Sequence, residues 1–210
     1  MSDIPLSLLA VHLSDGAVTE PWYVGGFVGA AALVAVACWR LPERDIPRVG
    51  VLTAAFFVAS SIPLRLAVLP TSVHPILNGL LGVCLGRRAP LAIAVGLTLH
   101  LFLLAHGGLT TLGLNTCIIA VPAVAAAAVH PALRRCGVPA FARGMVLGGG
   151  AVAGAAVLNY LVLLLGGQED WTTLAQLVLL AHLPVVVIEG FLVGVMVRYV
   201  EKVKPELLAT

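Results

Sequence analysis

Charged and aromatic residues are both scarce in this chain of 210 residues. Charged residues make up 10% of the chain and aromatic residues 6%, whereas 60% of the residues are hydrophobic and the mean hydropathy is +1.06. Soluble globular domains carry about 25% charged residues. So few polar side chains cannot cover a water-soluble body of this size, which excludes a soluble globular protein, a nucleic-acid-binding protein and a disordered chain. The composition therefore predicts an all-α, polytopic membrane protein.

The sequence also lacks common catalytic and nucleotide-binding motifs. It contains no GxSxG motif, no HExxH motif and no CxxC pair. Gly148-Gly149-Gly150 is not followed by the Lys-Ser/Thr of a phosphate-binding loop. We therefore predict that the protein is not an enzyme. Because it has no ATP-binding signature, active transport would require other subunits to supply the energy.

Long apolar runs fill most of the chain instead. A helix that crosses a hydrocarbon core about 30 Å thick needs about 20 residues, because each residue rises about 1.5 Å. We expect about seven transmembrane helices, in residues 22–39, 49–69, 73–85, 89–105, 114–133, 144–165 and 174–200. The run 73–85 is short and has Pro75 near its start, which suits a first helical turn, so we expect a helix that enters from a polar mouth. The chain is expected to form one integral-membrane domain over residues 1–210.

The positions of the basic residues predict the orientation. With seven spans, eleven of the twelve Lys and Arg residues fall on one side of the membrane, and only Arg65 falls on the other. Because an excess of Lys and Arg marks the cytoplasmic side, the N-terminus is expected outside and the C-terminus inside a cell membrane. The small net charge of +2 hides this sorting.

Several polar side chains are expected together at the outer face. His12 and Asp15 lie in the N-terminal segment, Ser72 and His74 precede the short helix, and His106 follows the run 89–105. Histidines from distant parts of the chain on one face suggest a metal site, because neutral imidazole binds nickel, cobalt, copper and zinc. Hydrogen-bonded structural histidines are the alternative.

Polar residues within the spans allow two interpretations. His100, His130 and His182 are interpreted as residues that form hydrogen bonds between helices. Glu189 is different, because a carboxylate inside the membrane is costly and is a functional hypothesis by default. It is expected either to have a structural partner, such as Arg65, His100 or another helix of the bundle, or to contact a coupling subunit.

Four ordered motifs resemble the substrate-binding membrane subunits of nickel/cobalt energy-coupling-factor (ECF) transporters, the CbiM/NikM family. Pro70-Thr71-Ser72-Val73-His74, followed by Asn78-Gly79-Leu80, resembles the family's TSVH…NG stretch, and residues 106–115 (HGGLTTLGLN) resemble another family segment. Residues 12–16 (HLSDG) resemble the His-Ile-Pro-Asp-Gly start of that family. His182-Leu183-Pro184 and Glu189-Gly190 also fit, so the resemblance covers nearly the whole chain.

The resemblance implies a metal site. In the family, the metal is held by the terminal amine, by the backbone nitrogen and imidazole of the first-motif histidine, and by the TSVH imidazole. Carried over, His12 and His74 are the metal ligands. Four nitrogens in a plane suit Ni(II), and Co(II) is also accepted. The groups that would support the ligands or shape the loop over them are Asp15, Ser72, Asn78 and His106.

The resemblance also implies partners and a transport function. The chain would capture Ni(II) or Co(II) at the outer face as transported substrate, with no bound organic cofactor. A membrane coupling (T) subunit and cytoplasmic ATPases would drive uptake in an ECF-type ABC complex. Two other classes remain open: a related subunit for an organic micronutrient such as a vitamin, and a membrane enzyme or assembly factor without transport.

The chain departs from the family at its start. The first-motif histidine is the second residue in the family, whereas residues 1–10 precede Val11-His12 here. Residues 1–16 are therefore read as an N-terminal extension plus a metal-binding segment. The extension is either removed after Ala10, or an artefact of a start codon at Val11, or retained, in which case Asp15 or His106 would replace the amine. We expect one of the first two, and the intact mass of the mature protein distinguishes them from the third.

Overall fold

The computed structural model describes residues 12–65 and 72–208. In these ranges the chain forms eight α-helices, with three short 3-10 turns and one small pair of strands. The helices are α1 (Glu20–Cys38), α2 (Ile46–Ser60), α3 (Asn78–Leu85), α4 (Ala89–Leu104), α5 (Leu112–Arg135), α6 (Ala140–Gly166), α7 (Thr172–Ala181) and α8 (Leu183–Val203). The prediction of an all-α membrane bundle is therefore confirmed.

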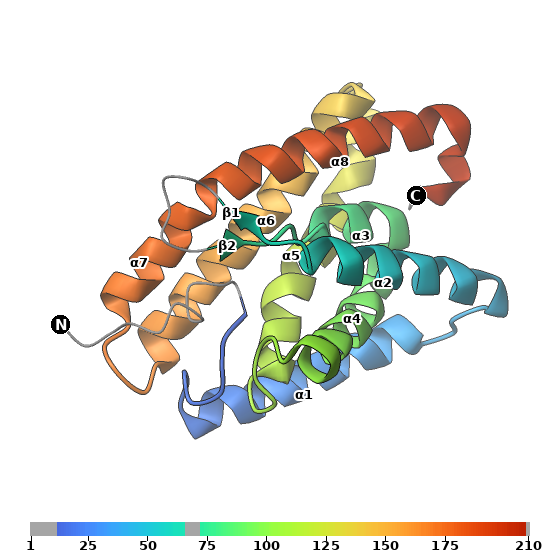
Figure 1. Ribbon diagram of the computed structural model, residues 1–210. Coiled ribbons are helices and arrows are strands. Elements are labelled where there is room, and N and C mark those ends of the chain that lie inside the picture. Colours follow the sequence, from blue (N-terminus) through green and yellow to red (C-terminus); the bar gives the residue numbers. More distant parts are fainter. Residues whose placement is uncertain (1–11, 66–71, 209–210) are drawn as a thin grey trace.

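Five helical stretches in the described parts of the chain are long and apolar enough to cross a membrane. They are Glu20–Cys38, Asn78–Leu104, Leu112–Arg135, Ala140–Gly166 and Thr172–Val203. The second stretch joins α3 and α4 through the 3-10 turn η3 (Gly86–Arg88), and the last joins α7 and α8. Figure 1 shows α7 and α8 following one another along one edge of the molecule and α1 along the opposite edge.

Two of the expected helix boundaries were wrong. The run 49–69 is helical only as far as Ser60, because Ser60 and Ser61 donate their hydroxyls to the carbonyls of Phe56 and Phe57 at 2.5 and 2.6 Å, and Pro63 follows. Beyond it, β1 (Leu64–Arg65) pairs antiparallel with β2 (Ser72–Val73).

The short helix begins at Asn78 and not near Pro75. Leu77 has a left-handed conformation with φ 51°, which a helix cannot continue through. Residues 75–77 therefore form a turn that leads into α3.

The run 174–200 contains a break. α7 ends at Ala181 and α8 begins at Leu183, with His182 between them. Pro184 lacks the N–H that would continue the hydrogen-bond ladder at this point. The two helices are nevertheless nearly continuous, as Figure 1 shows.

Glycines allow α3, α6 and α8 to pack closely. A Cβ atom on Gly144 of α6 would lie 2.6 Å from the Cα of Gly194 on α8. A Cβ atom on Gly79 of α3 would lie 2.6 Å from the Cα of Gly148 on α6. In lipid, where no hydrophobic force drives helices together, such backbone approach supplies the packing energy. α6 and α8 consequently form the most extensive helix pair in the described structure.

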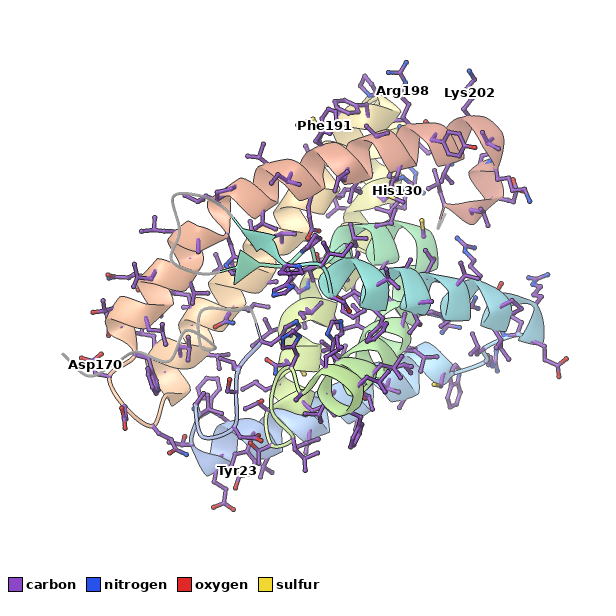
Figure 2. The ribbon with its side chains drawn as sticks, in the orientation of Figure 1. Tyr23, His130, Asp170, Phe191, Arg198 and Lys202 are labelled. Carbon is purple, nitrogen blue, oxygen red and sulfur yellow. The ribbon has the colours of Figure 1, made fainter. Side chains whose placement is uncertain are left out.

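The two ends of the bundle differ in chemistry. At one end, Arg88 forms an ion pair with Asp45, and Arg143 forms one with Glu201 at 2.5 Å. Figure 2 shows Arg198 and Lys202 on the C-terminal part of α8, far from Asp170 at the start of α7. At the other end, Thr19 donates its N–H to the carbonyl of Gly166 at 2.8 Å, which ties the segment before α1 to the end of α6.

Candidate metal site

Four histidines gather at the end of the bundle opposite the arginines. The ring centroids of His12 and His100 are 6.0 Å apart, those of His100 and His106 are 6.1 Å apart, and those of His106 and His74 are 5.6 Å apart. They come from four segments: the one before α1, the turn before α3, α4 itself and the loop after α4. We call these four residues the histidine cluster. In the described residues, no three His, Cys, Asp or Glu side chains form a ready metal site, so a bound ion would need further donors or a small closure.

Asn115 fixes the backbone beside His12. Its Oδ1 accepts the N–H of Leu13 at 2.8 Å, and its Nδ2 donates to the carbonyl of Leu13 at 2.9 Å. The hydroxyl of Thr111 donates to the same carbonyl at 2.6 Å. The side chain of Asn115 thus satisfies both backbone groups of Leu13, as a neighbouring strand would, and holds the segment against the first turn of α5.

Asp15 connects the same segment to the loop after α4. Its carboxylate accepts the N–H of Leu109 at 3.1 Å, and the N–H and hydroxyl of Thr110 at 2.8 and 2.5 Å. Partial burial acts to raise the pKa of the Asp15 carboxyl, but the hydrogen bonds from Thr110 and Leu109 outweigh it and lower the pKa below its usual value. A Cβ atom on Gly108 would collide with the backbone nitrogen of Asp15, so the loop requires glycine here.

Glu189 holds the turn that carries His74. Its side chain is 0% exposed, and its two carboxylate oxygens accept the backbone N–H groups of Ile76 and, at 2.8 Å, Leu77. Glu189 therefore has a structural partner within this chain, which is the turn before α3 and not His100, whereas its contact with a coupling subunit stays a prediction. Backbone N–H groups compensate the buried charge.

Asn78 anchors the start of α3. Its Nδ2 donates to the carbonyls of Ile119 on α5 and Ala151 on α6, at 3.2 and 3.1 Å. These bonds, with those of Glu189, attach the His74 turn to three helices. The side chain of Ser72 and residues 1–11, including the predicted extension 1–10, lie outside the described parts of the structure.

The imidazoles of His12 and His74 are held in the neutral form. Burial, together with the neighbouring His100 and His74, lowers the pKa of His12 to about 3. Burial and then His106 lower the pKa of His74, although the backbone carbonyls of Ser60 and Ile62 act against this. A neutral imidazole is the form that binds a metal ion. The Nδ1 atom of His74 is buried and has no hydrogen-bond partner in the described structure.

His100 belongs to the site, which sequence reasoning missed. Its Nε2 lies 2.8 Å from the hydroxyl of Ser60 on α2, so the expected contact between helices is present. Its Nδ1, however, is buried and has no hydrogen-bond partner among the described residues. The backbone carbonyl of His100 accepts the N–H of His106 at 3.2 Å, which sets the loop after α4 beside it. Asn115 was also missed as a site residue, although it ends the motif 106–115.

His182 also lies near the cluster. Its Nδ1 is 2.6 Å from the carbonyl of Val178, one turn earlier, so its hydrogen bond is within the α7 end and not between helices. Its proximity contributes to lowering the pKa of His12. It therefore borders the histidine cluster but already has a backbone partner.

Comparisons with known proteins identify the family. Residues 12–207 match the family model CbiM, described as the cobalt uptake substrate-specific transmembrane region. A putative metal transport protein of Haemophilus influenzae is 34% identical over 204 residues, covering 94% of this chain and 97% of that protein. A putative fused cobalt transport protein CbiMQ of Methanocorpusculum labreanum is 27% identical and covers 95% of this chain, which spans 36% of that protein.

A solved structure shares the fold. The crystal structure of a transition metal transporter superposes with a TM-score of 0.81 at 19% sequence identity, covering 91% of this chain and 93% of that one. The match over residues 12–207 includes every helix named above. The chain therefore belongs to the CbiM family and is a multi-pass membrane protein of metal-ion transport.

Proposed function

We propose that this chain captures Co(II) or Ni(II) as its transported substrate, with His12 and His74 as direct ligands. The observation that carries the proposal is the histidine cluster, in which imidazoles from four segments meet at one end of the bundle. Nitrogen-rich sites favour borderline metals such as cobalt and nickel over magnesium or calcium. Backbone nitrogen of the segment around His12 would supply donors that the side chains lack.

The supporting groups have separate tasks in this proposal. Asp15 and Asn115 hold the His12 segment, whereas Glu189 and Asn78 hold the turn of His74. His106 lies between the two, with its ring centroid 5.6 Å from that of His74. Groups that orient metal ligands commonly change affinity 10–100-fold when they are lost.

We propose seven membrane crossings, with the N-terminus outside and the C-terminus in the cytoplasm. His74 precedes α3 and His106 follows α4, yet their rings are neighbours, so α3 and α4 run in opposite directions and form a hairpin. The eight residues of α3 cover only about 12 Å, which places the turn of His74 well within the bundle. The arginine end faces the cytoplasm in this arrangement. The orientation can be tested with a reporter enzyme that is active only outside the cytoplasm, fused after Thr210. Activity of this reporter would contradict a cytoplasmic C-terminus.

We further propose that transport requires a membrane coupling subunit and cytoplasmic ATPases. The chain has no ATP-binding signature, so the free energy of uptake must come from elsewhere. The relative named as a fused CbiMQ protein carries additional sequence in the same polypeptide, which fits a substrate-binding unit that works with a membrane partner.

Metal binding by the purified chain tests the proposal. His74→Ala and His12→Ala are each expected to lose Co(II) and Ni(II) binding, measured by calorimetric titration, because a direct ligand is removed. His130→Asn is the matched control, because His130 is a buried histidine on α5 outside the cluster. Retention of both metals by folded His74→Ala would show that the ligand assignment is wrong.

A further inference from the structure

Three arginines surround a cavity at the end of the bundle opposite the histidine cluster. The cavity has a volume of about 530 Å³ and lies between α2, η3, α5 and the C-terminal turn η4 (Pro205–Leu207). Its charged lining residues are Arg48, Arg87, Arg88 and Glu206. Positive side chains thus outnumber the single carboxylate that faces the cavity.

Two of these guanidinium groups have no carboxylate partner among the described residues. Arg48 donates to the backbone carbonyls of Cys84 and Leu207, and Arg87 donates to the carbonyl of Trp39 at 3.0 Å. Arg88 is the exception, because it pairs with Asp45. Carbonyl oxygens orient a guanidinium group but do not neutralise its charge, so the cavity retains a positive potential.

Two buried hydrogen-bond donors also favour an anion in the cavity. The Nε atoms of Arg48 and Arg88 are buried and have no hydrogen-bond partner in the described structure. A buried donor without an acceptor is costly, and an anion in the cavity would supply acceptor oxygens. The planar guanidinium group suits phosphate in particular.

An apolar groove adjoins the arginine cavity. It has a volume of about 340 Å³, lies between α2, α3 and α8, and shares Arg48 and Cys84 with the cavity. Val51 and Met196 line it and are 69% and 40% exposed, so the groove opens on the side of the bundle. Arg48 therefore stands at the border between a cationic space and an apolar one.

We propose that the cavity and the groove together bind an anionic phospholipid. The phosphate group would lie against Arg48 and Arg87, and an acyl chain would lie in the groove between α2 and α8. Basic pockets between membrane helices commonly bind anionic lipid headgroups. A free phosphate ion would use the cavity but leave the groove empty, which is why the lipid is the better match. The inference requires only that the chain lies in a bilayer, and does not depend on the metal ligands.

Lipid titration of the purified full chain in a neutral detergent tests the headgroup site. Phosphatidylglycerol and phosphatidylcholine are compared by native mass spectrometry, and phosphatidylglycerol is expected to bind more tightly. Arg87→Gln is expected to weaken its binding about fivefold, the usual effect of one basic residue near an anionic headgroup. Arg135→Gln removes the same charge from an exposed position at the end of α5 outside the cavity, and is expected to leave binding unchanged.

Filling the groove tests the acyl-chain site. Val51→Trp is expected to weaken phosphatidylglycerol binding, whereas Val28→Trp on α1, where the native side chain is 66% exposed, is the matched control. Inorganic phosphate is titrated separately and is expected to bind far more weakly than the lipid. The proposal is overturned if the two lipids bind equally, if Arg87→Gln and Arg135→Gln have the same effect, or if phosphate alone binds as tightly as phosphatidylglycerol.

Discussion

The two ends of the bundle differ in the charge of their side chains and in the hydrogen-bond partners of those side chains. At one end, the low pKa of His12 keeps its imidazole neutral beside the other histidines, and the acidic groups Asp15 and Glu189 bind backbone N–H groups. At the other end, guanidinium groups keep their charge and bind backbone carbonyls or carboxylates. Backbone groups are hydrogen-bond partners at both ends, because few side-chain partners exist in so apolar a chain, and at the arginine end the carboxylates of Asp45 and Glu201 add counter-charges. Neutral nitrogens suit a metal cation, and free guanidinium groups suit an anion.

Among changes outside the proposed metal ligands, the largest effect is expected from Glu189→Gln. A glutamine can accept only one of the two N–H groups of Ile76 and Leu77, and its amide would face the other, so the turn of His74 shifts. We expect metal affinity to fall about 10–100-fold, measured by calorimetric titration with Co(II). Glu169→Gln, an exposed change in the loop before α7, is the control. Unchanged affinity in Glu189→Gln would show that this carboxylate does not position His74.

A smaller effect is expected from Asn115→Ala. The variant removes both bonds to Leu13, but the bond from Thr111 to the same carbonyl remains, so the His12 segment loosens without being released. We expect metal affinity to fall about tenfold, measured in the same titration. Asn115→Asp keeps an oxygen that accepts the Leu13 N–H but sets a second, acceptor-only oxygen against the buried Leu13 carbonyl, so its affinity is expected to fall at least as far as that of Asn115→Ala. Native affinity in both variants would contradict this account.

Breaking the ion pair at the arginine end should affect stability alone. The side chain of Arg143 is 5% exposed and that of Glu201 is 29% exposed, so Glu201→Gln leaves a nearly buried guanidinium group without its counter-charge, while the bond to Val138 and a neutral amide oxygen remain. Thermal unfolding in detergent is expected to show a loss of about 1–2 kcal/mol, because partial exposure limits the cost. Metal affinity is expected to stay the same. A change in affinity would mean that the two ends are coupled.

The smallest change is expected in the protonation of His12 between pH 7 and pH 5. Its pKa in the folded chain is about 3, so the imidazole stays neutral over this range, and its NMR signals should not shift. The unfolded chain has the ordinary value of about 6.5 and binds a proton sooner. His12 therefore contributes stability that is complete above about pH 6.5 and is lost as the pH falls toward 3. An NMR midpoint near pH 6.5 would contradict the burial of His12.

Sequence reasoning predicted the helical class and most of the helices. The runs 22–39, 114–133 and 144–165 lie within or close to α1, α5 and α6, because the thickness of a bilayer imposes a minimum length on an apolar helix. The C-terminal end of α2 and the start of α3 were not predicted. They depend on hydroxyl bonds of Ser60 and Ser61 and on the contact of Glu189 with Leu77, which have no hydrophobic signature.

The candidate site could be predicted only in part. The motif resemblance selected His12, His74, Asp15 and His106, and the structure brings these residues to the same end of the bundle. His100 was read as a residue that bonds between helices, because its distance from His12 along the chain gives no indication of contact. Asn115 and Glu189 act on backbone N–H and carbonyl groups. Such partners cannot be identified from side-chain types alone.

The sequence by itself determined that this chain lies in a membrane and belongs to a metal-transport family, because apolar length and motif order are local properties. Only the tertiary structure decided which polar groups meet. Asn115 and Leu13 are separated by 102 positions, and Glu189 and Leu77 by 112, yet each pair forms a hydrogen bond. In an apolar bundle every buried polar group needs a partner, and the close packing of α3, α5, α6 and α8 decides which partner it finds.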